Sequence, residues 1–124
     1  MGLFSNLFSK GKLAKPVDLS VLKTDMHSHL IPGIDDGSDS LETSMNLIKG
    51  MVDLGYSKII TTPHIQGEFY KNTPDIILRG LEKVKREMKK QFIHVDIEAA
   101  AEYLIDDKFE EKYNTGKLLT FGEG

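Results

Sequence analysis

Cysteine is absent from this chain of 124 residues. Disulfide bonds, thiolate nucleophiles and cysteine-ligated metal sites are therefore excluded, and any metal ion must be held by His, Asp or Glu side chains. A chain without disulfides is compatible with a cytoplasmic protein, and the cytoplasm is the location that we expect.

A surplus of positive charge is also lacking. The 16 Lys and Arg residues stand against 19 Asp and Glu residues, which gives a formal net charge of −3. Proteins that bind nucleic acid through bulk charge need a clear excess of basic residues on one face. We therefore expect no nucleic-acid partner.

Long apolar runs are missing as well, since no stretch approaches the roughly 20 residues that cross a bilayer. The first 15 residues, MGLFSNLFSKGKLAK, place four apolar side chains at helical spacing ahead of three lysines. A secretory signal has the opposite order, with charge first and the apolar stretch second. We expect residues 1–20 to form an amphipathic or flexible leader, with at most weak contact between residues 1–15 and a membrane surface.

From Val21 onward, strand and helix patterns alternate. Strands are predicted at residues 21–26, 58–62 and 92–100, and the start of a fourth at 117–121; helices are predicted from Asp39 to Gly55, from Thr73 to about Lys90, and over 106–113. The first helix has Asp39 as its predicted N-cap with Glu42 three residues on, and the second has Thr73 as its cap with Pro74 behind it.

This order of elements predicts an α/β fold with a parallel sheet, because each helix carries the chain back over the sheet to begin the next strand. In such sheets, functional side chains gather at the carboxyl ends of the strands. Candidate site residues are therefore sought where the predicted strands end.

Side chains that bind metals follow three of the predicted strands. His27 and His29 come after the first strand, His64 after the second and Glu102 after the third, while Asp36 lies in the loop behind the histidine pair. Residues two apart in an extended backbone point to the same face, so the pair can reach one ion. Imidazole and carboxylate ligands together suit divalent zinc, manganese or iron. The sequence therefore predicts a metal site at this edge.

Two further aspartates are candidates for orienting the ligands. Asp25 stands beside the histidine pair, where its carboxylate can hold an imidazole by a hydrogen bond. Asp35 precedes Asp36, and neighbouring side chains normally point to different sides. The segment Asp36-Gly37 is also typical of an ordinary turn.

Two glutamates lie near the end of the third strand, Glu98 within it and Glu102 just after it, and one of them is expected to face the site. The change toward helix comes after Glu102, which favours that residue. His94 lies inside or at the start of the same strand, away from its carboxyl end, and we interpret it as structural.

Four segments in order carry a family resemblance: Asp25-Met-His-Ser-His29, Ile34-Asp-Asp-Gly37, Thr61-Thr-Pro-His64 and Ala99-Ala-Ala-Glu-Tyr103. The chain resembles the opening of the polymerase and histidinol phosphatase (PHP) superfamily over roughly residues 22–122. The branch it most resembles is the manganese-dependent protein-tyrosine phosphatases of bacterial capsule and exopolysaccharide clusters.

This resemblance implies a distorted seven-stranded (βα) barrel, of which residues 21–124 would form about the first three to four βα units. It also implies that a cluster of divalent ions, manganese in the first place and zinc or iron as alternatives, binds phosphotyrosine and activates water. The ligands carried over by position are His27, His29, Asp36, His64 and Glu102. The implied partner is a phosphotyrosine protein, in particular a bacterial tyrosine kinase.

Members of this branch are roughly twice as long, and their second half supplies a further histidine, an Asp-x-His pair and arginines that bind phosphate. We therefore expect the chain to match the amino-terminal half and to be incomplete as a catalyst. Only Arg79 and Arg86 are available here, both on a predicted helix and expected to be solvated. The alternatives are a non-catalytic metal- or partner-binding remnant that self-associates through an open sheet edge, or another phosphoesterase such as a histidinol phosphatase.

Overall fold

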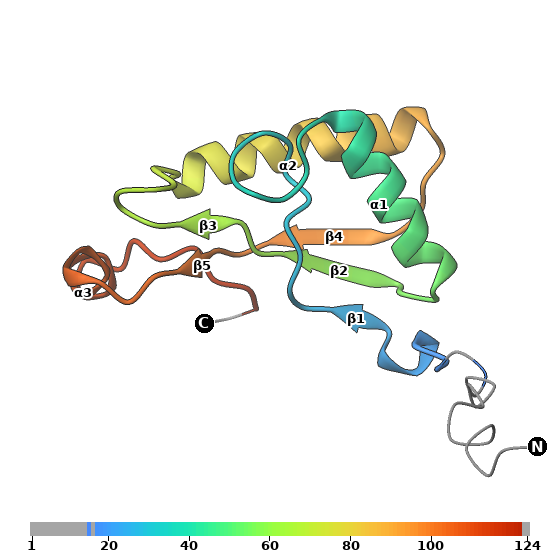
Figure 1. The fold of residues 1–124 in the computed structure, drawn as a ribbon, viewed down its shortest axis with the longest axis horizontal. Helices are drawn as coiled ribbons and strands as arrows, with labels where there is room; N and C mark the ends of the chain where they lie inside the picture. Colours follow the sequence, from blue (N-terminus) through green and yellow to red (C-terminus); the bar gives the residue numbers. More distant parts are fainter. Residues whose placement is uncertain (1–14, 16, 123–124) are drawn as a thin grey trace, which may run out of the picture.

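The computed structural model describes residue 15 and residues 17–122. In this part of the chain, two long helices lie on the same side of a set of parallel strands (Figure 1). The elements in chain order are η1 (Ser20–Leu22), β1 (Thr24–Asp25), α1 (Leu41–Asp53), β2 (Lys58–Thr61), β3 (His64–Ile65), α2 (Pro74–Lys90), β4 (Asp96–Ala99), β5 (Glu102–Tyr103) and α3 (Asp107–Asn114).

The strands form two parallel sheets. The larger has the order β1-β2-β4, with Thr24 opposite Lys58 and Lys58 opposite Asp96; the smaller pairs β3 with β5. Helix α1 connects β1 to β2, and α2 connects β3 to β4. The predicted α/β fold with a parallel sheet is confirmed.

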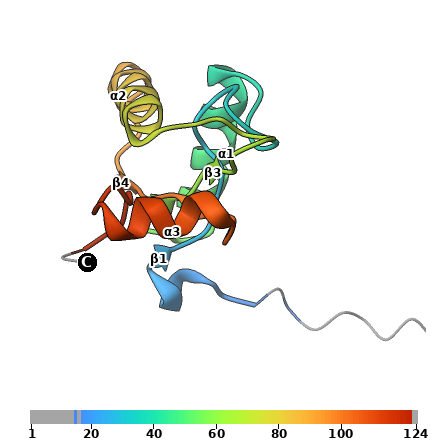
Figure 2. The same ribbon diagram turned by 90° about the vertical axis from the view of Figure 1, so that its left-hand side faces the viewer.

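The core lies between the two long helices and the larger sheet, and α1 and α2 pack side by side above it (Figure 2). The buried face of α2 consists of four side chains at helical spacing: Ile77, Leu81, Val84 and Met88. Burying such a side chain stabilises the fold by about 1.5–3 kcal/mol relative to leaving it in water. Their partners include Met45 and Ile48 of α1, Ile59 of β2, Ile97 of β4, and Leu30 and Ile31 of the loop after β1.

The second helix begins as predicted, and the first begins one residue later than predicted. Thr73 caps α2 by accepting a hydrogen bond from the backbone N–H of Ile76 at 3.3 Å. The N-cap of α1 is Ser40, which accepts from the N–H of Thr43 at 3.1 Å. The prediction of Asp39 as the cap was wrong because its carboxylate accepts the hydroxyl of Thr43 instead, at 2.6 Å.

The strands at 21–26 and 92–100 are shorter than predicted. Residues 20–22 form a short 3₁₀ helix, and Lys23 has a positive φ of 59°, which interrupts an extended backbone and confines β1 to two residues. Phe92 likewise has a φ of 55°, which places it in the turn after α2, and β4 begins at Asp96.

The predicted strand at 117–121 is not found. This segment still lies beside β5, because the carbonyl oxygen of Leu119 accepts a hydrogen bond from the N–H of Ala101 at 3.2 Å. The N–H of Leu119 donates to the hydroxyl of Tyr103 at 2.6 Å, so a side chain takes the place of a strand partner. Burial raises the pKa of the Tyr103 hydroxyl.

None of the helices in the described part of the chain is both long and apolar enough to cross a membrane. Residues 1–14 and 16, which include most of the predicted amphipathic leader, lie outside the described residues. The proposed membrane contact of that leader and the boundary at residue 20 stay predictions.

Candidate metal centre

Strands β2 and β4 are interrupted at the same level, which places the candidate ligands together. After β2 and β4, the chain makes a short irregular segment and then continues as β3 and β5, which pair in parallel. His64 stands directly opposite Glu102 in this register. The predicted ligands from the second and third strand ends are therefore direct neighbours.

The histidine pair after β1 is held against the end of β2 by its own backbone. The buried Thr61 hydroxyl donates to the carbonyl of Ser28 at 2.8 Å and accepts from the N–H of Leu30 at 2.9 Å. The N–H of Thr62 also donates to Ser28, at 2.6 Å. These bonds fix the backbone on both sides of His29, and the Thr62 hydroxyl lies 3.1 Å from Nδ1 of His27.

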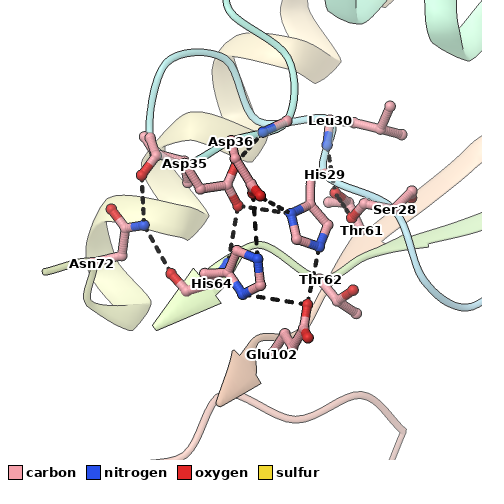
Figure 3. A network of polar contacts seen from close by, with 12 residues as sticks. Ser28, His29, Leu30, Asp35, Asp36, Thr61, Thr62, His64, Asn72 and Glu102 are labelled. Carbon is pink, nitrogen blue, oxygen red and sulfur yellow. Dashed lines mark hydrogen bonds and ion pairs between the residues drawn. The ribbon is translucent and has the colours of Figure 1, made fainter. Parts of the chain in front are cut away.

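The loop that carries the two aspartates folds back over His29 (Figure 3). Asp35 has a fully buried side chain, and its Oδ2 atom lies 3.0 Å from Nδ1 of His29 while accepting the N–H of His64 at 3.0 Å. The side-chain amide of Asn72 donates to the carbonyls of Ile34 and His64, at 2.9 and 2.8 Å. The loop and β3 are thereby joined next to the ligands.

Two carboxylate oxygens stand at the centre of the cluster. Oε2 of Glu102 lies 3.1 Å from Nε2 of His29, 3.3 Å from Nδ1 of His64 and 3.7 Å from Nε2 of His27. Oδ1 of Asp36 lies 3.3 Å from Nε2 of His64 and 3.5 Å from Nδ1 of His29. The donor atoms form two overlapping groups, one of His27, His29 and Glu102 and one of His29, Asp36 and His64, within 4.8 Å in each group.

These residues fit divalent metal ions. When the neutral imidazole of His29 donates a hydrogen bond from Nδ1–H to Asp35, its Nε2 atom carries a lone pair. That lone pair faces the acceptor oxygen of Glu102. Two acceptors at such a distance repel each other unless a cation lies between them. Ligands held about 2.1 Å from one ion are themselves roughly 3–3.5 Å apart, which is the range of the shorter distances here.

Burial differs across the centre. The side chains of His29 and His64 are only 14% exposed, whereas those of His27 and Asp36 are 67% and 62% exposed. The buried imidazoles form the floor, and the exposed pair forms the edge that water and a ligand can reach. Three carboxylates, of Asp35, Asp36 and Glu102, give the centre a negative field that attracts cations.

The structure brings together all five predicted ligands and Asp35. Asp25 differs, because within the described residues it makes no hydrogen bond to an imidazole and its Oδ2 atom is buried without a partner. Glu98 is bound to Lys58 at 2.7 Å instead of facing the cluster. His94 is exposed and lies ahead of β4, at the opposite edge of the sheet.

Other residues contact the cluster although no motif or spacing in the sequence predicts that they lie there. The ring of Tyr70 is stacked on that of His64, with centroids 5.2 Å apart and planes 9° from parallel. The amide of Gln66 lies 3.2 Å from Nδ1 of His64. Arg79 and Arg86 are exposed on α2, as expected, and do not reach the cluster.

Comparison with known proteins identifies the family of this chain. The model of a family described as capsular polysaccharide synthesis, CpsB/CapC, matches residues 23–124. The chain belongs to the CpsB/CapC family. This membership confirms the resemblance to the capsule-linked branch.

Relatives in this family have names that state an activity. The chain is 34% identical over 96 residues to tyrosine-protein phosphatase CpsB of Streptococcus agalactiae, covering 77% of this chain and 40% of that protein. It is 26% identical over 99 residues to tyrosine-protein phosphatase YwqE of Bacillus subtilis, covering 80% and 39%. The chain thus spans about two fifths of the length of these relatives.

A solved structure is similar in fold. It comes from the study of YwqE from Bacillus subtilis and CpsB from Streptococcus pneumoniae, described there as unique metal-dependent tyrosine phosphatases. The TM-score is 0.71 at 25% sequence identity, with 79% of this chain and 40% of that chain covered.

Proposed function

We propose that this chain carries the metal-binding part of a centre that hydrolyses phosphotyrosine on proteins, in the service of capsule or exopolysaccharide synthesis. The observation that carries the proposal is the convergence of three imidazoles and two carboxylates from three strand ends, with acceptor atoms facing one another. Support comes from the relatives of the same family, which are named tyrosine-protein phosphatases.

The proposed chemistry needs no cysteine. Divalent cations held by this donor set would neutralise phosphate oxygens, lower the pKa of water and stabilise the departing phenolate. The role of Glu102 is to join the histidines, because its Oε2 atom is within 3.7 Å of all three. Asp35 would keep Nε2 of His29 turned toward the cluster by holding Nδ1.

We propose manganese as the native metal, with zinc and iron as alternatives that the same ligands accept. The parallel strands described here would be the first units of a distorted seven-stranded barrel, completed by segments that correspond to the other three fifths of the relatives. The proposed partner is a bacterial tyrosine kinase in its phosphorylated form, and the proposed location is the cytoplasm.

Titration of the purified chain with Mn²⁺, followed by calorimetry, tests the metal centre. We expect binding that is lost in His29→Ala and kept in His94→Ala, because His94 lies at the other edge of the sheet. The metal-loaded chain is then assayed for phosphate release from a phosphotyrosine peptide. We expect metal-dependent release that is slower than that of Bacillus subtilis YwqE; a chain that binds no divalent metal would contradict the proposal.

A further inference from the structure

The segment from Gln66 to Tyr70 forms a closed loop beside the candidate metal centre. Its ends are joined by two backbone hydrogen bonds, from the N–H of Gln66 to the carbonyl of Tyr70 at 3.0 Å and in the reverse sense at 2.9 Å. Both end residues also touch the ligand His64, through the Gln66 amide and the stacked Tyr70 ring. The loop is therefore fixed directly to a ligand of the centre.

The far side of the loop is held by the start of α3. Glu68 forms an ion pair with Lys108 at 3.2 Å. Gly67 lies so close to this helix that an added Cβ atom would be 3.0 Å from Cδ of Lys108 and 3.4 Å from a carboxylate oxygen of Asp106. The loop after β3 and helix α3 lie at the same end of the molecule (Figure 1). The tip of the loop thus has a defined position between α3 and the metal ligands.

Apolar side chains at this edge are left in water. Phe69, at the tip of the loop, is 79% exposed, and Leu104 and Ile105, on the neighbouring segment after β5, are 49% and 83% exposed. Exposed apolar side chains that adjoin a polar centre are typical of a surface that a ligand covers. The ring of Tyr70 is stacked on His64, and Phe69 is its neighbour in the loop, with a ring that is exposed to water.

We propose that Phe69 contacts the aromatic ring of the substrate, and that the loop 66–70 thereby selects aryl over alkyl phosphate esters. This inference rests on the proposed function, which places the phosphate group at the cluster. A phosphate held there would have its ester group directed away from the buried imidazoles of His29 and His64, toward the surface where the loop 66–70 ends. Two aromatic rings attract each other in offset or edge-to-face arrangements with centroids 4.5–7 Å apart, and an alkyl ester offers no such contact.

Binding of two phosphonates to the Mn²⁺-loaded chain tests this role. Benzylphosphonate presents a ring and propylphosphonate does not, and the P–C bond of both resists hydrolysis. We expect Phe69→Ala to weaken benzylphosphonate binding roughly 3- to 10-fold and to leave propylphosphonate binding within about twofold. The matched control is Phe92→Ala, since Phe92 is 81% exposed and lies ahead of β4, at the opposite edge; it should change neither affinity.

Three results would overturn the role of Phe69. Equal weakening of both phosphonates in Phe69→Ala would mean that the substitution disturbs the phosphate site itself. Unchanged benzylphosphonate binding would mean that the ring is held elsewhere, with the proposed function intact. Failure of the metal-loaded wild-type chain to bind either phosphonate would refute the placement of the phosphate group at the cluster, on which this inference rests, whereas failure to bind Mn²⁺ would refute the proposed function itself.

A fluorescence measurement gives an independent readout. The chain contains no tryptophan, so Phe69→Trp introduces a single indole at the tip of the loop. We expect its emission to change on addition of benzylphosphonate and not of propylphosphonate, whereas Phe92→Trp should respond to neither. If the emission of the indole at position 69 did not change on addition of benzylphosphonate, the proposed contact would be overturned.

Discussion

The buried carboxylate of Asp35 accepts a hydrogen bond from the backbone N–H of His64 at 3.0 Å. The same oxygen lies 3.0 Å from Nδ1 of His29, and the other oxygen accepts the N–H of Gly37 at 3.0 Å. One carboxylate therefore positions ligands from two strand ends while closing its own loop. Side chains with this role often matter for metal affinity nearly as much as the ligands do.

Asp35→Asn should weaken Mn²⁺ binding by roughly 10- to 100-fold. The carboxylate accepts hydrogen bonds on both oxygens, whereas the amide has an NH₂ group in place of one of them and so loses the bond to His29 and His64 or the bond to Gly37. Isothermal titration calorimetry measures the effect. Asp53→Asn serves as the control, since Asp53 is exposed at the end of α1. An unchanged affinity in Asp35→Asn would show that the orientation of His29 does not depend on this carboxylate.

The two glutamates of the third strand region should differ sharply. Glu102→Gln is expected to abolish measurable Mn²⁺ binding, because Oε2 of Glu102 contacts all three imidazoles. Glu98→Gln should leave binding intact, since Glu98 is paired with Lys58. Equilibrium dialysis with metal analysis compares the two proteins, and equal losses would contradict the assignment of Glu102.

Two glycines make a matched pair for stability. A Cβ atom on Gly37 would lie 2.3 Å from Cβ of His29 and 2.5 Å from its carbonyl oxygen, so Gly37→Ala should cost about 1–3 kcal/mol in the free energy of unfolding. Gly50 lies within α1 with open space around it, so Gly50→Ala should raise the free energy of unfolding by about 0.5–1 kcal/mol. Urea unfolding of the metal-free proteins measures both changes, and a stabilising Gly37→Ala would refute the close packing of the loop on His29.

The start of α1 should make the stability pH-dependent in acid. Hydrogen bonds from Thr43 and, to a smaller extent, Ser40 hold the pKa of Asp39 below its ordinary value of 3.8. A carboxyl group whose pKa is lowered on folding stabilises the fold above its unfolded pKa, and the contribution is lost as the pH falls through the folded pKa. The melting temperature of Asp39→Asn should therefore lie below that of the wild type at pH 6, with the gap closing below about pH 4. A gap independent of pH would contradict this role of the Asp39 carboxylate.

The sequence was most informative where the physical cause is local. Helix α2 follows from Thr73, Pro74 and an apolar spacing that lie within one segment, so its limits could be predicted. The convergence of the candidate ligands could be predicted because each stands where a strand ends, and parallel strands bring those ends to one edge.

Features that depend on distant partners could not be predicted. The length of β1 depends on the positive φ of Lys23 and on pairing with β2, and the segment around Leu119 meets a tyrosine hydroxyl where a strand was expected. The contacts of Tyr70 and Asn72 with His64 depend on how the chain after β3 folds back, which no spacing in the sequence indicates.

The candidate ligands come from segments far apart in the chain, with 75 positions separating His27 from Glu102. An unfolded chain cannot hold these side chains around one ion, so a cation that binds the centre binds the folded form alone. Such binding stabilises the fold by RT ln(1 + [M]/Kd), which is about 2.7 kcal/mol at a free metal concentration 100 times Kd. The supply of metal would then set the fraction of the protein that is folded as well as the occupancy of the centre.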